Sequence, residues 1–343
     1  MYMNPRRGYR YRVDPVRHVL LAASRSAWLQ HHAAELPFVR RGVQRFMPGE
    51  DLGDALEALG TLAQQGLAGV LTELGEGVSE PAKADAAARD YQEALAQVHA
   101  RGLDCDVSVK LTHLGCDIDA ERCLARVRSL VKRATECRRF VWIDMEQHSY
   151  VESTLRTYRQ LVAEFQNVGI CLQAYLYRTA DDLSSLIERG GGVRLVKGAY
   201  REPAAVAYAR KRDVDDNFLA LADRLLSAQA RSAGVRAVFG THDRRMIEAV
   251  QALGSAASIP AGAFEFHMLY GIQRAEQVRL VREGYRVRVL ISYGTQWFPW
   301  YMRRLAERPA NLLFAAKAVF STSGRPSAAR RRGTAGDTPG TRP

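Results

Sequence analysis

The sequence lacks the signatures of several common protein classes. Only five cysteines occur in 343 residues and no two are spaced as C-x-x-C, so we expect neither a disulfide framework nor a structural zinc site. No apolar run reaches about 18 residues, so we expect no membrane-spanning helix. The arginine-rich first residues are not followed by the apolar segment of a secretory signal. These absences predict a cytoplasmic protein with at most peripheral contact with the inner face of a membrane.

Positive charge is concentrated at the two ends of the chain. The net charge is +12, but residues 1–17 and residues 322–343 each hold five Arg against one Asp. Such ends can attract anionic lipid or nucleic acid, or they can serve solubility alone. We favour solubility and expect no nucleic-acid binding, because no other feature of the sequence supports it. The apolar fraction of 47% and the charged fraction of 25% are those of an ordinary globular protein.

Between the ends, short apolar runs alternate with helical stretches. The eight runs are 69–74, 106–111, 140–145, 169–175, 193–197, 237–240, 263–268 and 287–291. The helical stretches are 16–36, 52–65, 81–99, 121–135, 150–166, 180–188, 203–233, 245–253 and 274–283, with a last pair at 297–306 and 310–319. Strands that alternate with helices indicate βαβ units and a parallel sheet, and eight such units close into a barrel.

We therefore predict an α/β fold, a (β/α)8 TIM-like barrel with N-terminal helices over residues 15–320. Residues 1–14 are predicted to be an irregular basic N-terminus, and residues 321–343 a disordered Arg/Gly/Ser/Pro tail. The alternative is a doubly wound open sheet, which normally carries G-x-G-x-x-G after its first strand. The first run is instead followed by Glu73-Leu74-Gly75-Glu76-Gly77, which favours the barrel.

Polar groups end six successive runs, where barrel enzymes carry their catalytic residues. Lys110 and Asp144 end adjacent runs and can form a structural ion pair, but six polar strand ends predict a polar ligand in the mouth. Further strand-end groups are Glu73, Glu76, Glu146, Gln173, Arg194, Lys197, Tyr200, Thr241, His242, Asp243, Glu265, His267, Ser292 and Tyr293. The cationic, donor-rich set at 194–197 and 241–242 suits a phosphate group, so we expect a phosphate-bearing cofactor.

Two more features bear on the ligands. Arg303 and Arg304 follow the aromatic segment 297–301, which suggests a partly buried helix whose arginines meet a substrate carboxylate. Solvated arginines and plain aromatic packing are the simpler interpretations. The histidines His113, His148, His242 and His267 lie in different units without H-x-x-x-H spacing, so no metal is expected.

At these residues the sequence resembles the proline dehydrogenase family, including the dehydrogenase domain of bifunctional proline-utilisation proteins. The resemblance covers roughly residues 45–319, and the order and spacing of its segments also agree. The segments that carry it are Val107–Leu111, Ile143–Glu146, Leu172–Tyr175, Arg194–Tyr200, Thr241–Asp243, Phe264–Phe266, Leu269–Gly271 and Arg303–Leu305.

The resemblance implies a barrel that holds FAD, oxidises L-proline to Δ1-pyrroline-5-carboxylate and passes electrons to a membrane quinone. It implies flavin contacts at Gln173, Arg194, Val196, Lys197, Gly198, Ala199, Thr241 and His242. It also implies that Lys110, Arg303 and Arg304 hold the substrate carboxylate, that Asp144 orders the site, and that Tyr200 and Leu269 pack on the substrate ring. Glu76 aligns loosely with an acidic residue that gates an active-site arginine.

Three positions depart from the family pattern. Leu290 and Trp300 stand where the family carries pocket tyrosines, and His267 replaces an expected glutamine. A substituted proline or another small secondary amino acid is therefore an alternative substrate. Two other classes stay open: a Schiff-base lyase or aldolase that uses Lys110 or Lys197, and a basic binding protein that acts through its ends.

Overall fold

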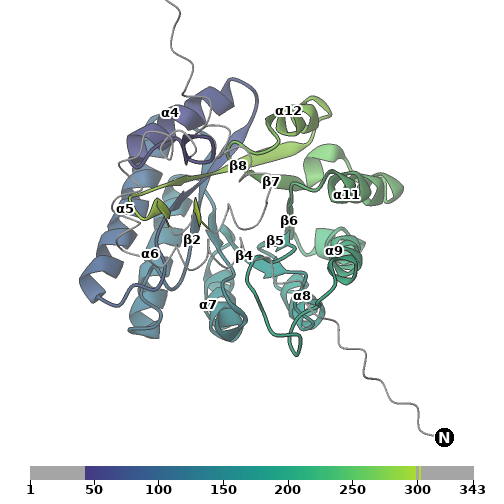
Figure 1. The fold of residues 1–343 in the computed structure, drawn as a ribbon, viewed down its shortest axis with the longest axis horizontal. Helices are drawn as coiled ribbons and strands as arrows, with labels where there is room; N and C mark the ends of the chain where they lie inside the picture. The colour runs from purple at the N-terminus through teal and green to yellow at the C-terminus, as the bar shows by residue number, and fades with distance from the viewer. Residues whose placement is uncertain (1–42, 299–300, 303–343) are drawn as a thin grey trace, which may run out of the picture. The chain divides into compact units, whose positions relative to one another are not determined.

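The computed structural model describes residues 43–298 and 301–302. Within them, eight parallel strands close into a barrel in sequential order, with helices around it (Figure 1). The predicted TIM-like barrel is confirmed. The predictions for the basic ends, the helix at 16–36 and the last helix pair lie wholly or largely outside the described residues. In the described part, no helix is long and apolar enough to cross a membrane, and the cysteines are free thiols.

Each predicted strand is present, with ends shifted by a few residues at most. The strands are β1 (Ala68–Glu73), β2 (Cys105–Val109), β3 (Val141–Ile143), β4 (Val168–Gln173), β5 (Gly192–Val196), β6 (Arg236–Gly240), β7 (Glu265–Leu269) and β8 (Arg286–Tyr293). Strand β8 closes the barrel on β1, with Leu290 in register with Val70. All eight strand directions are parallel, so their carboxyl ends form one face, called the mouth here, and their amino ends form the opposite face, called the floor.

The helices follow the strands in the order that the sequence predicts. They are α4 (Leu52–Ala63), α5 (Pro81–Ala100), α6 (Ala120–Glu136), α7 (Val151–Glu164), α8 (Thr179–Ile187), α9 (Lys211–Leu225), α10 (Ala228–Ser232), α11 (Arg244–Ala256) and α12 (Arg274–Arg282), with short 3-10 turns at His148–Tyr150 and Ala261–Ala263. Helix α4 (purple) lies beside β1 and β8 (Figure 1), so the first described helix covers the strands that close the barrel. Helix α6 illustrates the local cause: Asp119 caps it by accepting from Arg122 N at 3.0 Å, and its apolar stripe is buried.

The prediction of one helix over 203–233 is wrong. Residues 203–210 form a loop in which Ala207 pairs with Leu176 and Tyr208 N donates to Tyr175 O at 2.8 Å. The helical remainder is broken at Ser227, whose hydroxyl accepts from Ala230 N at 3.2 Å and starts α10. A serine that caps a new helix competes with continuation of the old one, which hydrophobic spacing alone does not reveal.

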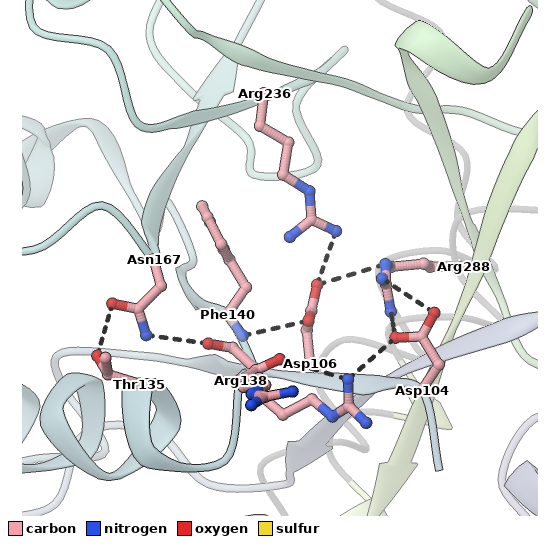
Figure 2. A pocket seen from close by; sticks show the side chains of 9 residues that line it. Asp104, Asp106, Thr135, Arg138, Phe140, Asn167, Arg236 and Arg288 are labelled. Atoms are coloured by element: carbon pink, nitrogen blue, oxygen red, sulfur yellow. Dashed lines mark hydrogen bonds and ion pairs between the residues drawn. The ribbon is translucent and has the colours of Figure 1, made fainter. Parts of the chain in front are cut away.

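The barrel interior holds a small apolar cluster and a set of charged groups. Its apolar part is a small cluster around the fully buried Trp142, with Val70, Val238 and the partly buried Leu290. Gly169 and Gly192 make room for the indole, because a Cβ at Gly169 would lie 2.5 Å from it and one at Gly192 2.9 Å from it. Below this cluster, arginines and carboxylates close the floor (Figure 2).

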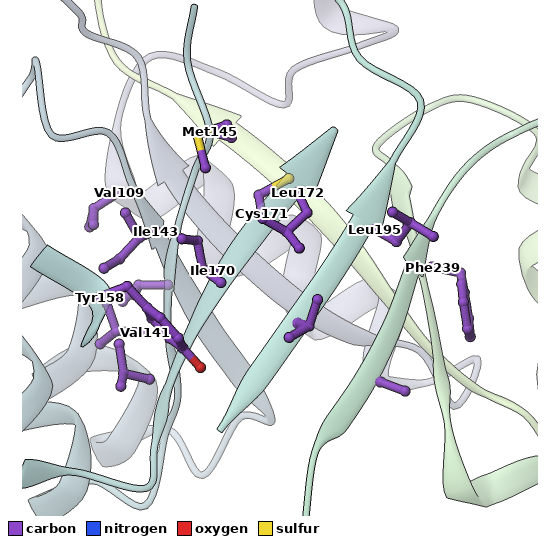
Figure 3. Close-up of a cluster of buried hydrophobic side chains, with 14 of the residues drawn as sticks. Val109, Val141, Ile143, Met145, Tyr158, Ile170, Cys171, Leu172, Leu195 and Phe239 are labelled. Carbon is purple, nitrogen blue, oxygen red and sulfur yellow. The ribbon is translucent and has the colours of Figure 1, made fainter. Parts of the chain in front are cut away.

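The main apolar core lies outside the barrel, between strands and helices. In Figure 3, Val141, Ile143 and Ile170 extend from adjacent strands toward Tyr158 of α7. The Tyr158 hydroxyl is satisfied by donating to Gly190 O at 3.2 Å. This outer core carries the stability of the fold. The interior is therefore free to hold polar groups.

Candidate active site at the mouth of the barrel

The mouth is organised by a buried arginine. Arg194, on β5, is 3% exposed and pairs with Asp144, the residue after β3. Its Nη2 also donates to Ser108 Oγ at 2.9 Å, and Ser108 Oγ donates to Asp144 Oδ1 at 3.0 Å. These three side chains from β2, β3 and β5 form a closed triangle across the interior.

The suggested ion pair between Lys110 and Asp144 is wrong. Asp144 takes Arg194 and Ser108 as partners, and Lys110 forms no ion pair within residues 43–298 and 301–302. Arg194 is buried far more deeply than Lys110, and a buried charge needs a carboxylate more than a partly solvated one does. Lys110 therefore keeps its ammonium available at the rim.

Trp142 supports the guanidinium from below. The Arg194 Cζ atom lies 5.3 Å from the indole centroid, a distance that permits a cation–π contact. Arg194 Nη1 is shielded from solvent and has no acceptor among the described residues. The guanidinium is thus held by two side chains and a ring, yet it retains an unused donor.

Gln173, at the end of β4, is the second buried polar group with unused capacity. Its Nε2 donates to Met145 O at 3.3 Å and Glu146 O at 3.1 Å. These bonds fix the orientation of the amide. Its Oε1 is buried and has no donor within the described part of the chain. A ligand N–H is the natural complement of such an oxygen.

Lys197, directly after β5, is tied into an acidic cluster. Its Nζ donates to Asp243 Oδ2 at 2.9 Å and also to Asp215. Burial alone would raise the pKa of Asp243, but Lys197, with Lys211 and Arg245 nearby, lowers it to about 2. These ion pairs occupy the amine that a Schiff-base mechanism would require, which disfavours Lys197 as a nucleophile.

His242 and Thr241 follow β6. Leu269 N donates to His242 Nε2 at 2.7 Å, so the ring proton of the neutral imidazole sits on Nδ1. Thr241 Oγ1 accepts from Asp243 N at 3.1 Å. The loop that begins with His242 is therefore joined to the end of β7.

Backbone rather than side chains shapes the end of β5. Val196 is the last strand residue, and Gly198 has a φ of +110°. A Cβ at Gly198 would also lie 2.4 Å from the Tyr175 ring. Only glycine suits both conditions, and Ala199 and the partly buried Tyr200 follow it on the rim. This stretch brings main chain to the mouth without a bulky side chain.

Two of the expected substrate contacts lie on adjacent strands. Leu269 ends β7 and is in register with Leu290 on β8, which packs in the interior cluster with Trp142. Trp300, Arg303 and Arg304 lie outside the described residues. The described mouth therefore combines Arg194, Asp144, Gln173 and the leucine pair.

Not all of the predicted strand-end residues belong to the mouth. Glu265 begins β7 and pairs with Arg236 and Arg288 at the floor, so its placement at the carboxyl end of that strand is wrong. Glu73 alternates with the inward Thr72 and shares the outer face with Leu71, where Asp90 of α5 is near. Burial, helped by Asp90, raises the pKa of Glu73 to about 7. The prediction that Glu73 belongs to the mouth is wrong, because side chains alternate along β1 and that of Glu73 points to the outer face.

Two residues that build the site were not predicted from the sequence. Ser108 and Trp142 each stand two residues before a predicted site residue, Lys110 and Asp144. The two-residue period of a strand places each pair on one face, so alternation contained the signal. A further buried pair, in which Thr112 Oγ1 donates to Glu146 Oε2 at 2.6 Å, fixes the loops after β2 and β3. No grouping of His, Cys, Asp and Glu in the described part is suited to a metal ion.

Comparison with known proteins gives one consistent result. A family model described as proline dehydrogenase matches residues 55–317. The chain is 41% identical to the proline dehydrogenase of Deinococcus radiodurans over 282 residues, 81% of this chain and 89% of that protein. It is 39% identical to proline dehydrogenase 1 of Bacillus subtilis subsp. natto over 305 residues, 89% of this chain and 99% of that protein.

A solved structure gives the same indication. The fold resembles a crystal structure of proline utilization A (PutA) from Bdellovibrio bacteriovorus inactivated by N-propargylglycine, with a TM-score of 0.74 and 25% identity. The match covers 85% of this chain and 36% of that longer protein.

Proposed function

The chain belongs to the proline dehydrogenase family, and from that premise we propose that it uses FAD to oxidise L-proline to Δ1-pyrroline-5-carboxylate. Membership of the family makes it an oxidoreductase. The observation that carries the cofactor proposal is the pair of buried, unpartnered atoms at the described mouth, Arg194 Nη1 and Gln173 Oε1. A buried donor and a buried acceptor at one end of the barrel suit a ring system whose edges carry both hydrogen-bond acceptors and hydrogen-bond donors.

The residues of the mouth fit a flavin dinucleotide. Gln173 and Arg194 offer the buried acceptor and donor, and His242, whose Nε2 accepts from Leu269 N, lies at the same end of the barrel. The main chain at 196–199 can approach a ligand closely because Gly198 adds no side chain. Lys197 and Thr241 complete the donor set that we assign to the nucleotide, with the Asp215–Asp243 cluster keeping Lys197 in place.

The protein's share of the chemistry is positioning. When bound, the flavin accepts a hydride from the substrate carbon. We assign Lys110, together with Arg303 and Arg304, to the substrate carboxylate, which fixes the carbon that loses the hydride. Tyr200 and Leu269 are assigned to the substrate ring. Asp144 orders the site by holding Arg194 and Ser108.

Positive potential near Lys110 also has a chemical use. Burial, with Lys110 adding to it, lowers the pKa of His113 to about 4, so the imidazole near that lysine is neutral at physiological pH. The same potential favours the neutral form of a substrate amine, whose lone pair must be available when the adjacent carbon loses hydride. A quinone completes the proposed reaction as electron acceptor.

A reduction experiment tests the proposal. The purified protein is expected to show flavin absorption, to bleach under anaerobic L-proline, and to regain colour when a soluble quinone is added. Mass spectrometry should find a product lighter than proline by two hydrogen atoms. Borohydride trapping of a carbonyl substrate on Lys110 or Lys197, in a protein without flavin, would instead support the lyase class.

A substituted proline or another small secondary amino acid is the second candidate substrate. It rests on Leu290, which lines the interior without a hydroxyl, while Ser108 and Arg194 already satisfy Asp144. Steady-state kinetics with L-proline, 4-hydroxyproline and N-methylglycine separate the two candidates. Saturable turnover of L-proline at the highest kcat/KM removes the second candidate. If a substituted substrate is preferred, Leu290→Tyr should shift the preference back toward L-proline.

A further inference from the structure

A cavity lies at the floor, the end of the barrel opposite the proposed active site. It has a volume of about 330 Å³ and is lined by residues that precede or begin strands (Figure 2). The lining residues are Asp104, Asp106, Thr135, Arg138, Arg139, Phe140, Asn167, Arg236 and Arg288. Most strands have five or six residues and separate it from the mouth by about 15 Å, so a ligand in one cannot fill the other.

Both arginines of the inner wall of this cavity are paired with carboxylates. Arg236 forms two hydrogen bonds of 2.9 Å with Glu265 and one of 2.9 Å with Asp106. Arg288 contacts Glu265 at 3.2 Å and Asp104 at 3.0 Å. Such mutual pairing is typical of a structural network at the stability face of a barrel.

The outer wall is not balanced. Arg138 is exposed and has no acidic partner within the described residues. Arg139 Nε is buried and has no acceptor there, and the nearest carboxylate oxygen, Asp104 Oδ1, is 3.6 Å from its Nη1. The lining counts four arginines against two aspartates, and Glu265 behind them removes only part of that excess. A network built for stability alone would leave no guanidinium nitrogen buried and unpaired.

The rim of the cavity is rigid enough to hold a ligand. Asn167 Nδ2 donates to Arg139 O at 2.9 Å and to Val131 O at 3.2 Å, and Thr135 Oγ1 donates to Asn167 Oδ1 at 2.9 Å. Arg236 lies over the Phe140 ring at 4.5 Å, which fixes the opposite side. The backbone of Arg139 is thus fixed while its side chain keeps an unused donor.

We propose that this floor cavity binds a compact oxyanion, a phosphate or carboxylate group, with Arg138 and Arg139 as its principal ligands. Guanidinium groups bind both anions through paired N–H donors, and a site with excess positive charge attracts them. The site goes beyond the proposed oxidation and does not depend on it.

Calorimetric titration tests the proposal on the protein as purified, with whatever cofactor it carries. The probes are sodium phosphate and sodium succinate, each against sodium chloride at equal ionic strength. The double variant Arg138→Gln/Arg139→Gln removes the two outer charges and keeps side-chain length. Lys132→Gln/Arg133→Gln removes two charges from α6, close in the chain to Arg138 and Arg139 but outside the cavity lining, and is the matched control.

The expected result is saturable binding of one probe, weakened at least tenfold in the first double variant and unchanged in the second. The tighter probe identifies the ligand as phosphate or carboxylate. Thermal unfolding should agree, with a rise of roughly 2 °C at a tenfold excess over Kd that is lost in the first variant. No binding tighter than about 10 mM, or equal binding in both double variants, would overturn the site. Loss of flavin chemistry would not affect either outcome.

Discussion

The two ends of the barrel hold arginines in opposite circumstances. At the floor, Arg236 and Arg288 share Glu265 and the neighbouring aspartates, so carboxylates neutralise their positive charge. At the mouth, Arg194 has one carboxylate, and a second nitrogen is buried without an acceptor among the described residues. Unmet hydrogen-bonding capacity, rather than charge itself, distinguishes the arginine at the mouth from the paired arginines on the inner wall of the floor.

Glu265 at the floor and His267, further along the same strand, lie between the two ends of the barrel. Burial alone would raise the pKa of Glu265, but His267 and Arg236 hold it far below its usual value. Burial lowers the pKa of His267 to about 4 and outweighs Glu265, whose Oε2 lies 3.6 Å from His267 Nε2. His267 packs edge-on against Trp142, the ring under Arg194. Charge at the floor is thus separated from the mouth by a neutral aromatic layer.

The largest expected effect is at the floor. Glu265→Ala leaves Arg236 and Arg288 without their shared carboxylate, so the free energy of unfolding should fall by about 3–5 kcal/mol. Flavin content should stay unchanged below the new melting temperature. Denaturant unfolding measures the free energy of unfolding, and visible absorbance measures the flavin content. The exposed pair Arg244–Glu248 is the control, worth about 0–1 kcal/mol when broken. A loss that small at Glu265 would contradict a stabilising floor.

His267→Gln should change how stability depends on pH. In the unfolded chain the imidazole of His267 is protonated below its ordinary pKa of 6.5. In the folded protein its pKa is lowered to about 4, so it is protonated only below that pH. Stability contributed by the neutral ring is therefore complete above pH 6.5 and lost as pH falls toward 4, by about 3 kcal/mol. Glutamine does not titrate, so the variant should lose that much less between these pH values. If the free energy of unfolding changed with pH in the same way in both proteins, the burial of a neutral His267 would be contradicted.

Arg194→Met tests the mouth. Loss of charged hydrogen bonds should weaken flavin binding by roughly 10–150-fold. The ratio of flavin absorbance to protein absorbance after dialysis measures this. The matched variant is Arg236→Met, which removes a partly buried arginine from the floor and should cost stability but keep flavin. Equal flavin retention in both variants would erase the difference between the two ends.

Gln173→Leu should have the smallest effect of the four. The variant loses one neutral hydrogen bond to the proposed flavin and two to main-chain oxygens, so affinity should fall by roughly tenfold or less. Fluorescence titration of the flavin-free protein with FAD measures it. Gln251→Leu, on the exposed face of α11, is the control and should leave affinity unchanged. Unchanged affinity in Gln173→Leu would remove this amide from the site.

The sequence predicted the barrel well because apolar runs and helical stretches are local signals. Eight strands followed from eight runs, and their order followed from the preference for adjacent parallel pairing. The break at Ser227 was missed, because a cap competes with helix extension only once neighbouring packing is known.

The site was predicted less completely. Strand-end position placed Gln173, Arg194 and His242 at the mouth, but the partner of each charged side chain depends on how deeply it lies in the barrel. Asp144 meets Arg194 across the interior rather than Lys110 beside it. Trp142 is a core residue by type, and only its place under Arg194 makes it part of the site.

The visible absorption spectrum of the purified protein, before and after anaerobic L-proline, tests the central claim most directly. The account predicts flavin bands that bleach on addition of the amino acid. A colourless protein that takes up no FAD on reconstitution would contradict it, because Arg194 Nη1 and Gln173 Oε1 would then be buried for some other partner.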